Sequence, residues 1–417
     1  MNTSSRRNFL KALGGATALA SFPTILKAAT TGPRVIVVGG GFGGATAAKY
    51  LKHWSPDLNV TLIEPKAKYQ SPIMSNLVLN GQLSMDQITF SYDALAQKYG
   101  VEVITDWVSG VDGVTQKVSL SSGAVLEYDR LILAPGITFN PVEGHDLDKV
   151  PHAWQSGEQV TMLQQQLEAM PAGGTFVMSI PAAPYRCPPG PYERACVIAD
   201  YLKSNKPGSK VIVLDANADI LVEKEIFGHA FDTTYAGIVE YHKEVVITGV
   251  DSDQLVVSTE SMSDIKADVL NIIPEQSAGE IIKSAGLITV ADRWAGVNPL
   301  SYESTMVNNI HVIGDSQGTG QPKAGHIANS EAKVCADAVI RLLNGGLPYA
   351  APMTNSACYS PVSADTATWL TAVYGYDSAT DSIQKVAGSG GSASTATKNN
   401  YEEMFVWSKS LFGDTFS

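Results

Sequence analysis

Short apolar runs rich in β-branched residues recur along the chain and are separated by stretches of helical spacing. The first run, at residues 34–38, is followed by glycines and then by the helix-like sequence ATAAKYLKHW at residues 45–54. A second run occupies residues 60–63, and two others end at Leu133 and Ile313. Continuous apolar runs of this length are typical of strands buried on both faces of a parallel sheet. We therefore predict an α/β fold in which such strands alternate with helices.

The glycines after the first run have the spacing of a dinucleotide-binding turn. Gly39, Gly41 and Gly44 form the pattern G-x-G-x-x-G, and Gly43 adds a further position without a side chain. The first glycine permits a tight turn, the second lets the backbone approach a pyrophosphate, and the third lets the helix pack close to the strand. Glu64 follows the second run, where its carboxylate can accept hydrogen bonds from a ribose. These five residues are predicted to bind a dinucleotide.

Two later segments decide between NAD and FAD, which share this turn. A buried strand at residues 130–134 breaks at Pro135-Gly136, and the run that ends at Ile313 is followed by Gly314-Asp315. Asp315 precedes a predicted helix at residues 325–343, so its carboxylate is placed to hydrogen-bond the polyol chain of a flavin. The glycine turn, the Pro-Gly break and the Gly-Asp pair, in this order, resemble the two-dinucleotide-domain flavoprotein superfamily. We therefore predict FAD, held also by Pro135, Gly136 and Asp315.

The second domain of that superfamily usually repeats the glycine turn to bind NAD, and this chain does not. Its predicted strand at residues 174–180 leads into PAAPYRCPPGPYER, which begins at Pro181. Five prolines in this loop remove five backbone N–H donors and fix φ at each position, so the loop cannot cradle a pyrophosphate. NAD is therefore not expected to bind, and electrons are expected to enter from a small reductant.

Composition and charge narrow the choice of partners. The 417 residues are 44% hydrophobic and 17% charged, which suits two or three packed domains. A formal net charge of −12 argues against nucleic acid, which needs a basic face, and favours a basic partner surface. The four cysteines have no metal-ligand spacing, so we predict neither a metal site nor a disulfide scaffold.

The first 29 residues have the features of a twin-arginine export signal. Arg6 and Arg7 precede a weakly apolar run at residues 12–26, which is followed by small residues. The run is shorter than the roughly 20 residues that span a bilayer, so we expect no permanent membrane anchor; a basic helix that stays attached is the alternative. Cleavage would remove four basic residues and change the net charge from −12 to −16. Because this route carries folded proteins, we predict a periplasmic location with the cofactor inserted before export.

Over nearly its whole mature length, the chain resembles the flavoprotein subunit of flavocytochrome c sulfide dehydrogenase, a relative of sulfide:quinone oxidoreductase. The segments that carry the resemblance are VVGGGFGGATAAKYLK, PAAPYRCPPGPYERA, KADVLNIIPEQSAGEI, IHVIGDSQGTGQPKAG, NSACYS and DTF. The resemblance implies an α/β fold with two Rossmann-like dinucleotide-binding-type domains, the FAD domain being split by the second, plus a small C-terminal domain. The expected ranges are 30–145 and 276–347 for the FAD domain, 146–275 for the second domain and 348–417 for the C-terminal domain.

The resemblance also implies a function and the residues that carry it. In that family sulfide reduces FAD through a redox-active cysteine pair, and single electrons pass to a c-type haem on a partner subunit. We therefore expect a reduced sulfur compound as substrate and a c-type cytochrome as partner. Cys187 matches the family cysteine of the RCPPGPYE loop, and Trp407 matches a tryptophan near the flavin. Lys323 is placed to stabilise negative charge on a reduced flavin, and Arg186 to lower the pKa of the Cys187 thiol. An inert thiol, a solvated lysine and a core tryptophan are the alternatives.

Two positions depart from the family pattern. The resemblance implies a second redox cysteine two residues after Gly314-Asp315, where this chain has Gln317, and a cysteine that tethers FAD where this chain has Pro72. FAD is therefore expected to be bound non-covalently, and the usual disulfide is not expected to form. A related oxidoreductase with a different donor, or a non-catalytic flavoprotein that binds a partner, are the alternative functions.

The other three cysteines are candidates for the missing partner. Cys335 is expected too far along its helix from the flavin, and Cys196 is expected in a core. A rearranged pair of Cys187 with Cys358 is left open. In the same C-terminal region as Cys358, the stretch Gly388–Asn400, rich in Gly, Ser and Thr, predicts a flexible surface loop.

Overall fold

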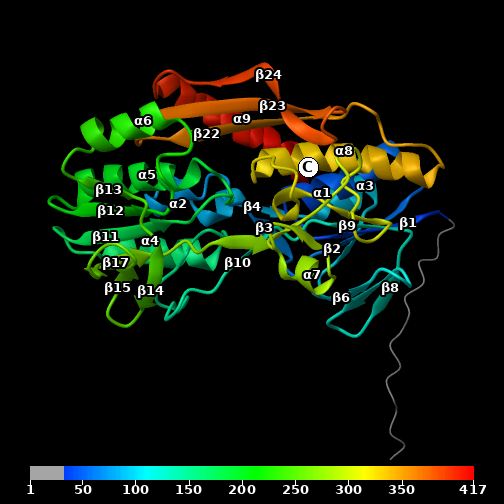
Figure 1. The fold of residues 1–417 in the computed structure, drawn as a ribbon, viewed down its shortest axis with the longest axis horizontal. Coiled ribbons are helices and arrows are strands. Elements are labelled where there is room, and N and C mark those ends of the chain that lie inside the picture. Colours follow the sequence, from blue (N-terminus) through cyan, green and yellow to red (C-terminus); the bar gives the residue numbers. More distant parts are fainter. Residues whose placement is uncertain (1–31) are drawn as a thin grey trace, which may run out of the picture.

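The computed structural model describes residues 32–417 (Figure 1), so the predicted export signal lies outside the described residues. One parallel sheet is built from segments far apart in the sequence. Its strand order is β21-β9-β1-β2-β5. The strands are β1 (Arg34–Val38), β2 (Asn59–Ile63), β5 (Glu102–Ile104), β9 (Arg130–Leu133) and β21 (Ile310–Val312). Because β21 follows a long insertion, the first domain is split by the second.

Three helices pack beside this sheet, and short strands extend it. The helices are α1 (Phe42–Trp54), α3 (Asp93–Tyr99) and α8 (Gly325–Leu343), of which α1 contacts both others. The predicted helix at residues 325–343 is thus confirmed. The smaller elements are β3 (Lys68–Gln70), α2 (Asn76–Leu79), β4 (Thr89–Ser91), β6 (Val108–Asp112), β7 (Lys117–Leu120), β8 (Val125–Glu127), β10 (Ile137–Phe139), β18 (Gln276–Ala278), α7 (Glu280–Ser284), β19 (Ile288–Val290) and β20 (Trp294–Ala295).

The inserted second domain repeats the same architecture. Its parallel sheet has the order β13-β12-β11-β17, and a small antiparallel sheet, β14-β15-β16, adjoins it. The elements are α4 (Glu158–Ala169), β11 (Thr175–Ile180), α5 (Gly190–Asn205), β12 (Lys210–Asp215), α6 (Lys224–His229), β13 (Val239–Lys243), β14 (Ile247–Asp251), β15 (Val256–Thr259), β16 (Ile265–Lys266) and β17 (Val269–Asn271). Two Rossmann-like domains are therefore present, as the sequence predicts.

The C-terminal region is an antiparallel sheet with one helix packed on it. Its elements are β22 (Met353–Pro361), β23 (Ala367–Asp377), β24 (Ser382–Ser392) and α9 (Lys398–Phe416). In Figure 1 this layer lies along the top of the molecule, and β22 contacts both α8 of the first domain and α5 of the second. The fold class predicted from the sequence is therefore confirmed.

The predicted flexible loop at Gly388–Asn400 is wrong. Its first residues form the end of β24, and its last residues begin α9. Gly390 pairs with Ala372 of β23 and has a φ of +132°, and a Cβ there would lie 2.3 Å from the carbonyl oxygen of Thr371. Glycine is needed here because another backbone approaches closely, so its presence does not indicate flexibility.

No helix within residues 32–417 is long and apolar enough to cross a membrane. The same range contains no cluster of three or more His, Cys, Asp or Glu side chains arranged to hold a metal ion.

Candidate active site

A cavity of about 620 Å³ lies at the carboxyl ends of the first sheet's strands. This edge is where ligands bind in open α/β folds, and the volume lies in the usual range for cofactor sites. Most of the residues predicted to bind the cofactor line it, namely Gly39, Gly41, Gly43, Glu64, Pro135, Gly136 and Asp315. Gly44, Lys323 and Trp407 do not line it, and each has a different place in the structure.

The glycine turn has the geometry that the motif predicts. Gly39 has a φ of +98°, and a Cβ there would lie 2.3 Å from the carbonyl oxygen of Ala134. A Cβ on Gly44 would lie only 1.8 Å from the carbonyl oxygen of Gly39, so this glycine lets α1 pack against the turn. Gly41 is the residue before α1, whose first N–H groups are thereby free to face a phosphate.

Glu64 is held by backbone amides at the end of β2. One carboxylate oxygen accepts from Gly40 N at 2.7 Å, and the other accepts from Lys66 N at 3.1 Å. Burial raises the pKa of Glu64, although these two hydrogen bonds oppose the shift. The side chain is therefore fixed in the cavity wall, where the remaining lone pairs can accept from ribose hydroxyls.

Asp315 supplies the clearest test of whether the cavity fits a flavin dinucleotide. Its side chain is 9% exposed, and its Oδ1 has no hydrogen-bond partner among residues 32–417. Burial raises the pKa of Asp315. A buried acceptor without a partner is costly unless a ligand pairs with it. A polyol hydroxyl would satisfy this oxygen, so the residues present fit FAD.

Lys323 lies beside Asp315 but points into the protein. Its Nζ donates to the carbonyl oxygens of Asp315 and Gln317, both at 2.8 Å, and lies 3.5 Å from the ring centroid of Trp294. Burial lowers the pKa of Lys323 to about 8. The ammonium therefore holds the Asp315 turn in place, and its direct action on a reduced flavin stays a prediction.

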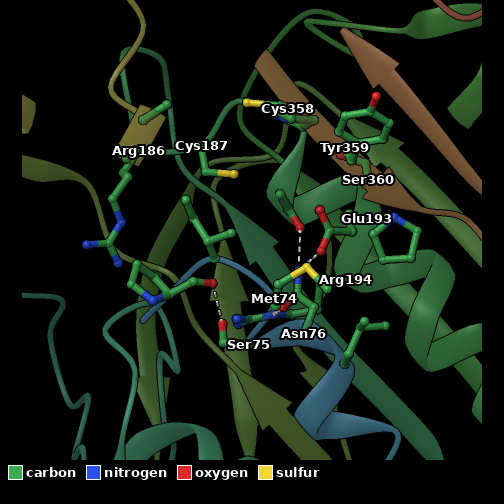
Figure 2. A pocket seen from close by; sticks show the side chains of 18 of the residues that line it. Met74, Ser75, Asn76, Arg186, Cys187, Glu193, Arg194, Cys358, Tyr359 and Ser360 are labelled. Atoms are coloured by element: carbon green, nitrogen blue, oxygen red, sulfur yellow. Dashed lines mark hydrogen bonds between the residues drawn. The ribbon is translucent and has the colours of Figure 1, made fainter. Parts of the chain in front are cut away.

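A second, smaller cavity of about 70 Å³ adjoins the first. Pro72, Arg186 and Gly325 line both cavities and so form the wall between them. Pro72 occupies the position at which the resemblance implies a tethering cysteine, and its ring has no nucleophile to bond a flavin. Cys187 and Cys358 line the smaller cavity, and Figure 2 shows both thiols near its upper end.

The loop between β11 and α5 fixes Cys187. Cys187 has a φ of +58°, which is unusual for a residue with a side chain. Its N–H donates to the carbonyl oxygen of Lys323 at 2.7 Å, and its carbonyl oxygen accepts from Gly190 N at 2.9 Å. A Cβ on Gly190 would lie 2.9 Å from the Cys187 sulfur, so the thiol packs directly against the start of α5.

The environment of Cys187 favours the neutral thiol. Burial raises the pKa of Cys187 well above its ordinary value, and Cys358 and Glu193 raise it further. Arg186 lowers it, but this effect is smaller than that of burial. The effect expected of Arg186 is therefore present, but burial outweighs it, and the pKa of Cys187 is raised overall.

The structure places a second thiol, that of Cys358, on the smaller cavity. Cys358 on β22 is a free thiol, as is Cys187, and burial raises its pKa to about 12. Gln317 lines neither cavity: its Nε2 donates to Glu331 Oε1 at 2.8 Å inside the first domain. Position 317 therefore lies away from the cavity of Cys187, and a pairing of Cys187 with Cys358 stays a hypothesis.

The remaining two cysteines lie in the cores that the sequence suggested. Cys196 on α5 and Cys335 on α8 are both 0% exposed, and neither lines either cavity. They are therefore structural, and the two cysteines that line a cavity are Cys187 and Cys358.

Glu193 is a site residue that the sequence analysis missed. It lies on the first turn of α5, lines the smaller cavity and is 8% exposed. Asn76 Nδ2 donates to its Oε1 at 2.9 Å, and burial raises its pKa to about 7 (Figure 2). The sequence did carry a signal for this residue. Glu193 follows Cys187 by six residues and falls in the first turn of the helix that begins at the cysteine loop.

Trp407 lies on the smaller cavity and not on the larger one. Its ring centroid is 5.6 Å from that of Tyr359 and 6.1 Å from that of His326. His326 Nδ1 accepts from Ala357 N at 2.9 Å, which fixes the strand next to Cys358. A direct contact of Trp407 with the flavin stays a prediction, whereas its place in the wall around the thiols is observed.

Comparisons with known proteins agree with this arrangement. The family model described as sulfide dehydrogenase (flavocytochrome c) flavoprotein chain, central, matches residues 160–274, and the model described as flavocytochrome c sulphide dehydrogenase, flavin-binding, matches residues 350–416. The flavoprotein chain of sulfide dehydrogenase (flavocytochrome c) from Chlorobaculum thiosulfatiphilum is 56% identical over 45 residues, which are 11% of this chain and 94% of that one. The chain belongs to the flavocytochrome c sulfide dehydrogenase flavoprotein family. Its cofactor is FAD, as the sequence predicts.

Relatives outside this family share the fold at lower identity. The sulfide-quinone reductase of Aquifex aeolicus is 22% identical over 365 residues, which cover 79% of this chain and 81% of that one. A crystal structure of the Aquifex aeolicus sulfide:quinone oxidoreductase has a TM-score of 0.76 at 17% identity and covers 92% of each chain. The putidaredoxin reductase–putidaredoxin complex gives a TM-score of 0.63 at 20% identity, with 92% of this chain and 93% of that one covered.

Proposed function

We propose that the protein is a periplasmic, FAD-dependent oxidoreductase that oxidises sulfide and delivers the electrons to a c-type cytochrome. The observation that carries the sulfide step is the pair Cys187 and Cys358, which line one small cavity adjoining the FAD cavity. A cavity of about 70 Å³ admits only small molecules, since one water needs about 10–15 Å³ by the same measure. Hydrosulfide is a substrate of that size.

The proposed chemistry starts from the oxidised cysteine pair. A hydrosulfide ion attacks one sulfur of a Cys187–Cys358 disulfide, so that a persulfide forms on one cysteine, the old S–S bond breaks and the other cysteine leaves as a thiolate. The persulfide loses its proton and joins that thiolate through the added sulfur atom, which releases two electrons. FAD, which residues such as Glu64 and Asp315 would hold in the larger cavity, would supply the acceptor for this electron pair and a way for the electrons to leave singly.

Two groups of this chain serve that reaction. Glu193, with a pKa of about 7, takes up the proton that the persulfide loses, because its carboxylate lines the same cavity. The second is the cysteine that leaves: burial disfavours its thiolate, which slows its departure but makes the thiolate, once formed, a stronger nucleophile.

The choice of acceptor and location has separate support. Relatives named as flavoprotein chains of flavocytochrome c have a cytochrome in their name, and a predicted mature charge of −16 suits a basic docking surface. The twin-arginine pattern at residues 1–29 supports export. Other relatives are named quinone reductases, so quinone is the competing acceptor.

A stopped-flow experiment tests the sulfide step. Anaerobic holoprotein is mixed with sulfide, and the flavin absorption is followed in the wild type and in Cys187→Ser, Cys358→Ser and Cys335→Ala. The first two variants are expected to lose at least about a hundredfold in reduction rate, and the third, whose thiol lies outside both cavities, to keep it. A wild-type flavin that stays oxidised in sulfide but is bleached by dithionite would refute the proposal.

A second experiment separates the acceptors. Sulfide-reduced protein is mixed with an oxidised c-type cytochrome or with a soluble quinone at equal concentrations, at low and at high salt. Rapid, salt-sensitive reoxidation by the cytochrome is expected. Preference for the quinone would overturn the cytochrome assignment and leave the sulfide step intact.

A further inference from the structure

The helices α1 and α8 begin side by side at the FAD cavity. Phe42, the first residue of α1, and Gly325, the first residue of α8, both line it. A Cβ on Gly325 would lie 2.6 Å from Cδ2 of Phe42, so the two helix starts are in direct contact. The shape of this wall therefore depends on whatever holds the two helices together.

The aromatic rings of Phe412 and Phe416, on the last two turns of α9, pack behind that wall. The ring centroid of Phe416 lies 5.8 Å from that of Phe42, 5.2 Å from that of Tyr69 and 5.0 Å from that of Phe90. Phe412, one turn earlier, lies 4.6 Å from Phe90 and 6.1 Å from Phe42. Since Phe42 and Tyr69 line the cavity, Phe416 supports two cofactor-facing side chains from behind.

A buried lysine binds the end of α9 to α1. Lys49 is 8% exposed, and its Nζ donates to the carbonyl oxygens of Gly413 at 3.3 Å, Asp414 at 2.8 Å and Ser417 at 2.7 Å. These carbonyls lie at the C-terminal end of α9, where a cation is favoured, and Gly413 O also accepts from Ser417 N at 3.2 Å. Lys49, on α1, therefore supplies hydrogen bonds to the carbonyl oxygens at the end of α9.

Polar side chains of α8 bind the same turn from the other side. Asn329 Nδ2 donates to Asp414 Oδ2 at 2.8 Å and to Thr415 Oγ1 at 3.1 Å. Lys333 forms an ion pair with Asp414 at 2.8 Å. The last turn of α9 is thus joined to both helices whose first residues line the FAD cavity.

We propose that residues Phe412–Phe416 act as a latch that keeps FAD in its cavity. The latch holds Phe42 and Tyr69 in place from behind, and Phe416 is its central positioning residue. Without that ring, Phe42 and Tyr69 would move into the space it leaves, and the cavity wall beside the glycine turn would open. The inference concerns cofactor retention and does not depend on the identity of the electron donor.

The test measures FAD release and folding separately. Holoprotein of the wild type, Phe416→Ala and the control Phe405→Ala is diluted at 25 °C into buffer with an apo-flavoprotein trap, and flavin release is followed by fluorescence. Phe405 is another phenylalanine of α9; it is half-buried, whereas Phe416 is buried, and it contacts Tyr401, away from the latch. Circular dichroism at the same temperature reports whether each variant remains folded.

We expect Phe416→Ala to release FAD about tenfold faster or more while its far-UV spectrum is unchanged, and Phe405→Ala to behave as wild type. Phe416→Leu, which restores bulk, should recover most of the retention. Should Phe416→Ala not fold, Lys49→Met provides the same test, because it removes the three hydrogen bonds to the end of α9. The proposal would be overturned if folded Phe416→Ala released FAD at the wild-type rate, or if Phe405→Ala released FAD as fast as Phe416→Ala.

Discussion

The backbone N–H of Cys187 donates to the carbonyl oxygen of Lys323 across 2.7 Å. The ammonium of the same lysine donates to the carbonyl oxygen of Asp315 at 2.8 Å. One residue therefore joins the loop that carries the cavity thiol to the turn that carries the FAD-facing carboxylate. Lys323 thus fixes the position of the smaller cavity relative to the larger one. The proposed transfer of electrons from the thiols to FAD needs such a fixed distance.

The position of the Cys187 thiol is expected to depend on Gly190. A Cβ on Gly190 would lie 2.9 Å from both the Cys187 sulfur and the ring of Trp154, so Gly190→Ala must displace one of them. We expect the rate of flavin reduction by sulfide to fall about tenfold or more, with FAD content unchanged. Gly228→Ala on α6, where an added Cβ meets nothing within 4 Å, is the matched control. Equal rates in the two variants would show that the thiol has room to adjust.

FAD affinity is expected to depend on the unpaired oxygen of Asp315. Asp315→Asn replaces a buried, charged acceptor with a weaker one, and a hydrogen bond to a charged group contributes about 1.5–3 kcal/mol. We therefore expect the dissociation constant for FAD to rise about tenfold to a hundredfold in calorimetric titration of the apoprotein. Asp337→Asn, on the exposed side of α8, should leave it unchanged. An unaltered affinity would mean that Asp315 Oδ1 does not meet the cofactor.

Sequence reasoning locates the FAD site well because each part of that site is local. The glycine turn, Glu64 and Asp315 each follow directly from a strand end, and the strand ends of a parallel sheet meet at one edge. The smaller cavity cannot be assembled in this way. It joins the loop before α5 to β22, and Cys187 and Cys358 share it because the C-terminal sheet lies across both domains.

Two other results depend on the whole fold. Arg186 lowers the pKa of the Cys187 thiol, as the sequence predicts, but burial outweighs this nearby charge, and burial is a property of the whole fold. The Gly-rich end of β24 is predicted to be a loop because composition does not reveal that a neighbouring strand needs the space.

Restoring a cysteine at position 317 is expected to fail. Gln317→Cys would remove the donor that Glu331 accepts from at 2.8 Å and leave part of a buried carboxyl without its partner. We expect a loss of about 1–3 kcal/mol in the free energy of unfolding, measured by urea denaturation. Mass spectrometry of the unreduced variant should find no cross-link between Cys187 and the introduced thiol, because position 317 lines neither cavity. Such a cross-link would restore the pairing that the family pattern implies.

Glu193 should make the protein less stable as the pH rises through the weakly acidic range. Its pKa is about 7 in the folded protein and about 4.3 in an unfolded chain. Below about pH 4 both states hold the proton, so burial of the neutral carboxyl costs little. As the pH rises towards 7 the unfolded chain releases the proton first, and stability falls by about 1.4 kcal/mol per pH unit, or roughly 3–4 kcal/mol in all.

Glu193→Gln removes this loss, since the amide has no proton to release and its carbonyl oxygen can still accept from Asn76. The variant's stability relative to wild type is therefore expected to increase between about pH 4.5 and 7 and then to level off. Urea denaturation at half-unit pH steps measures the difference, with Glu402→Gln at an exposed position of α9 as the control. Parallel stability curves for Glu193→Gln and wild type would show that the pKa of Glu193 is not raised. The proposed role of Glu193 as a proton acceptor near neutral pH would then be wrong.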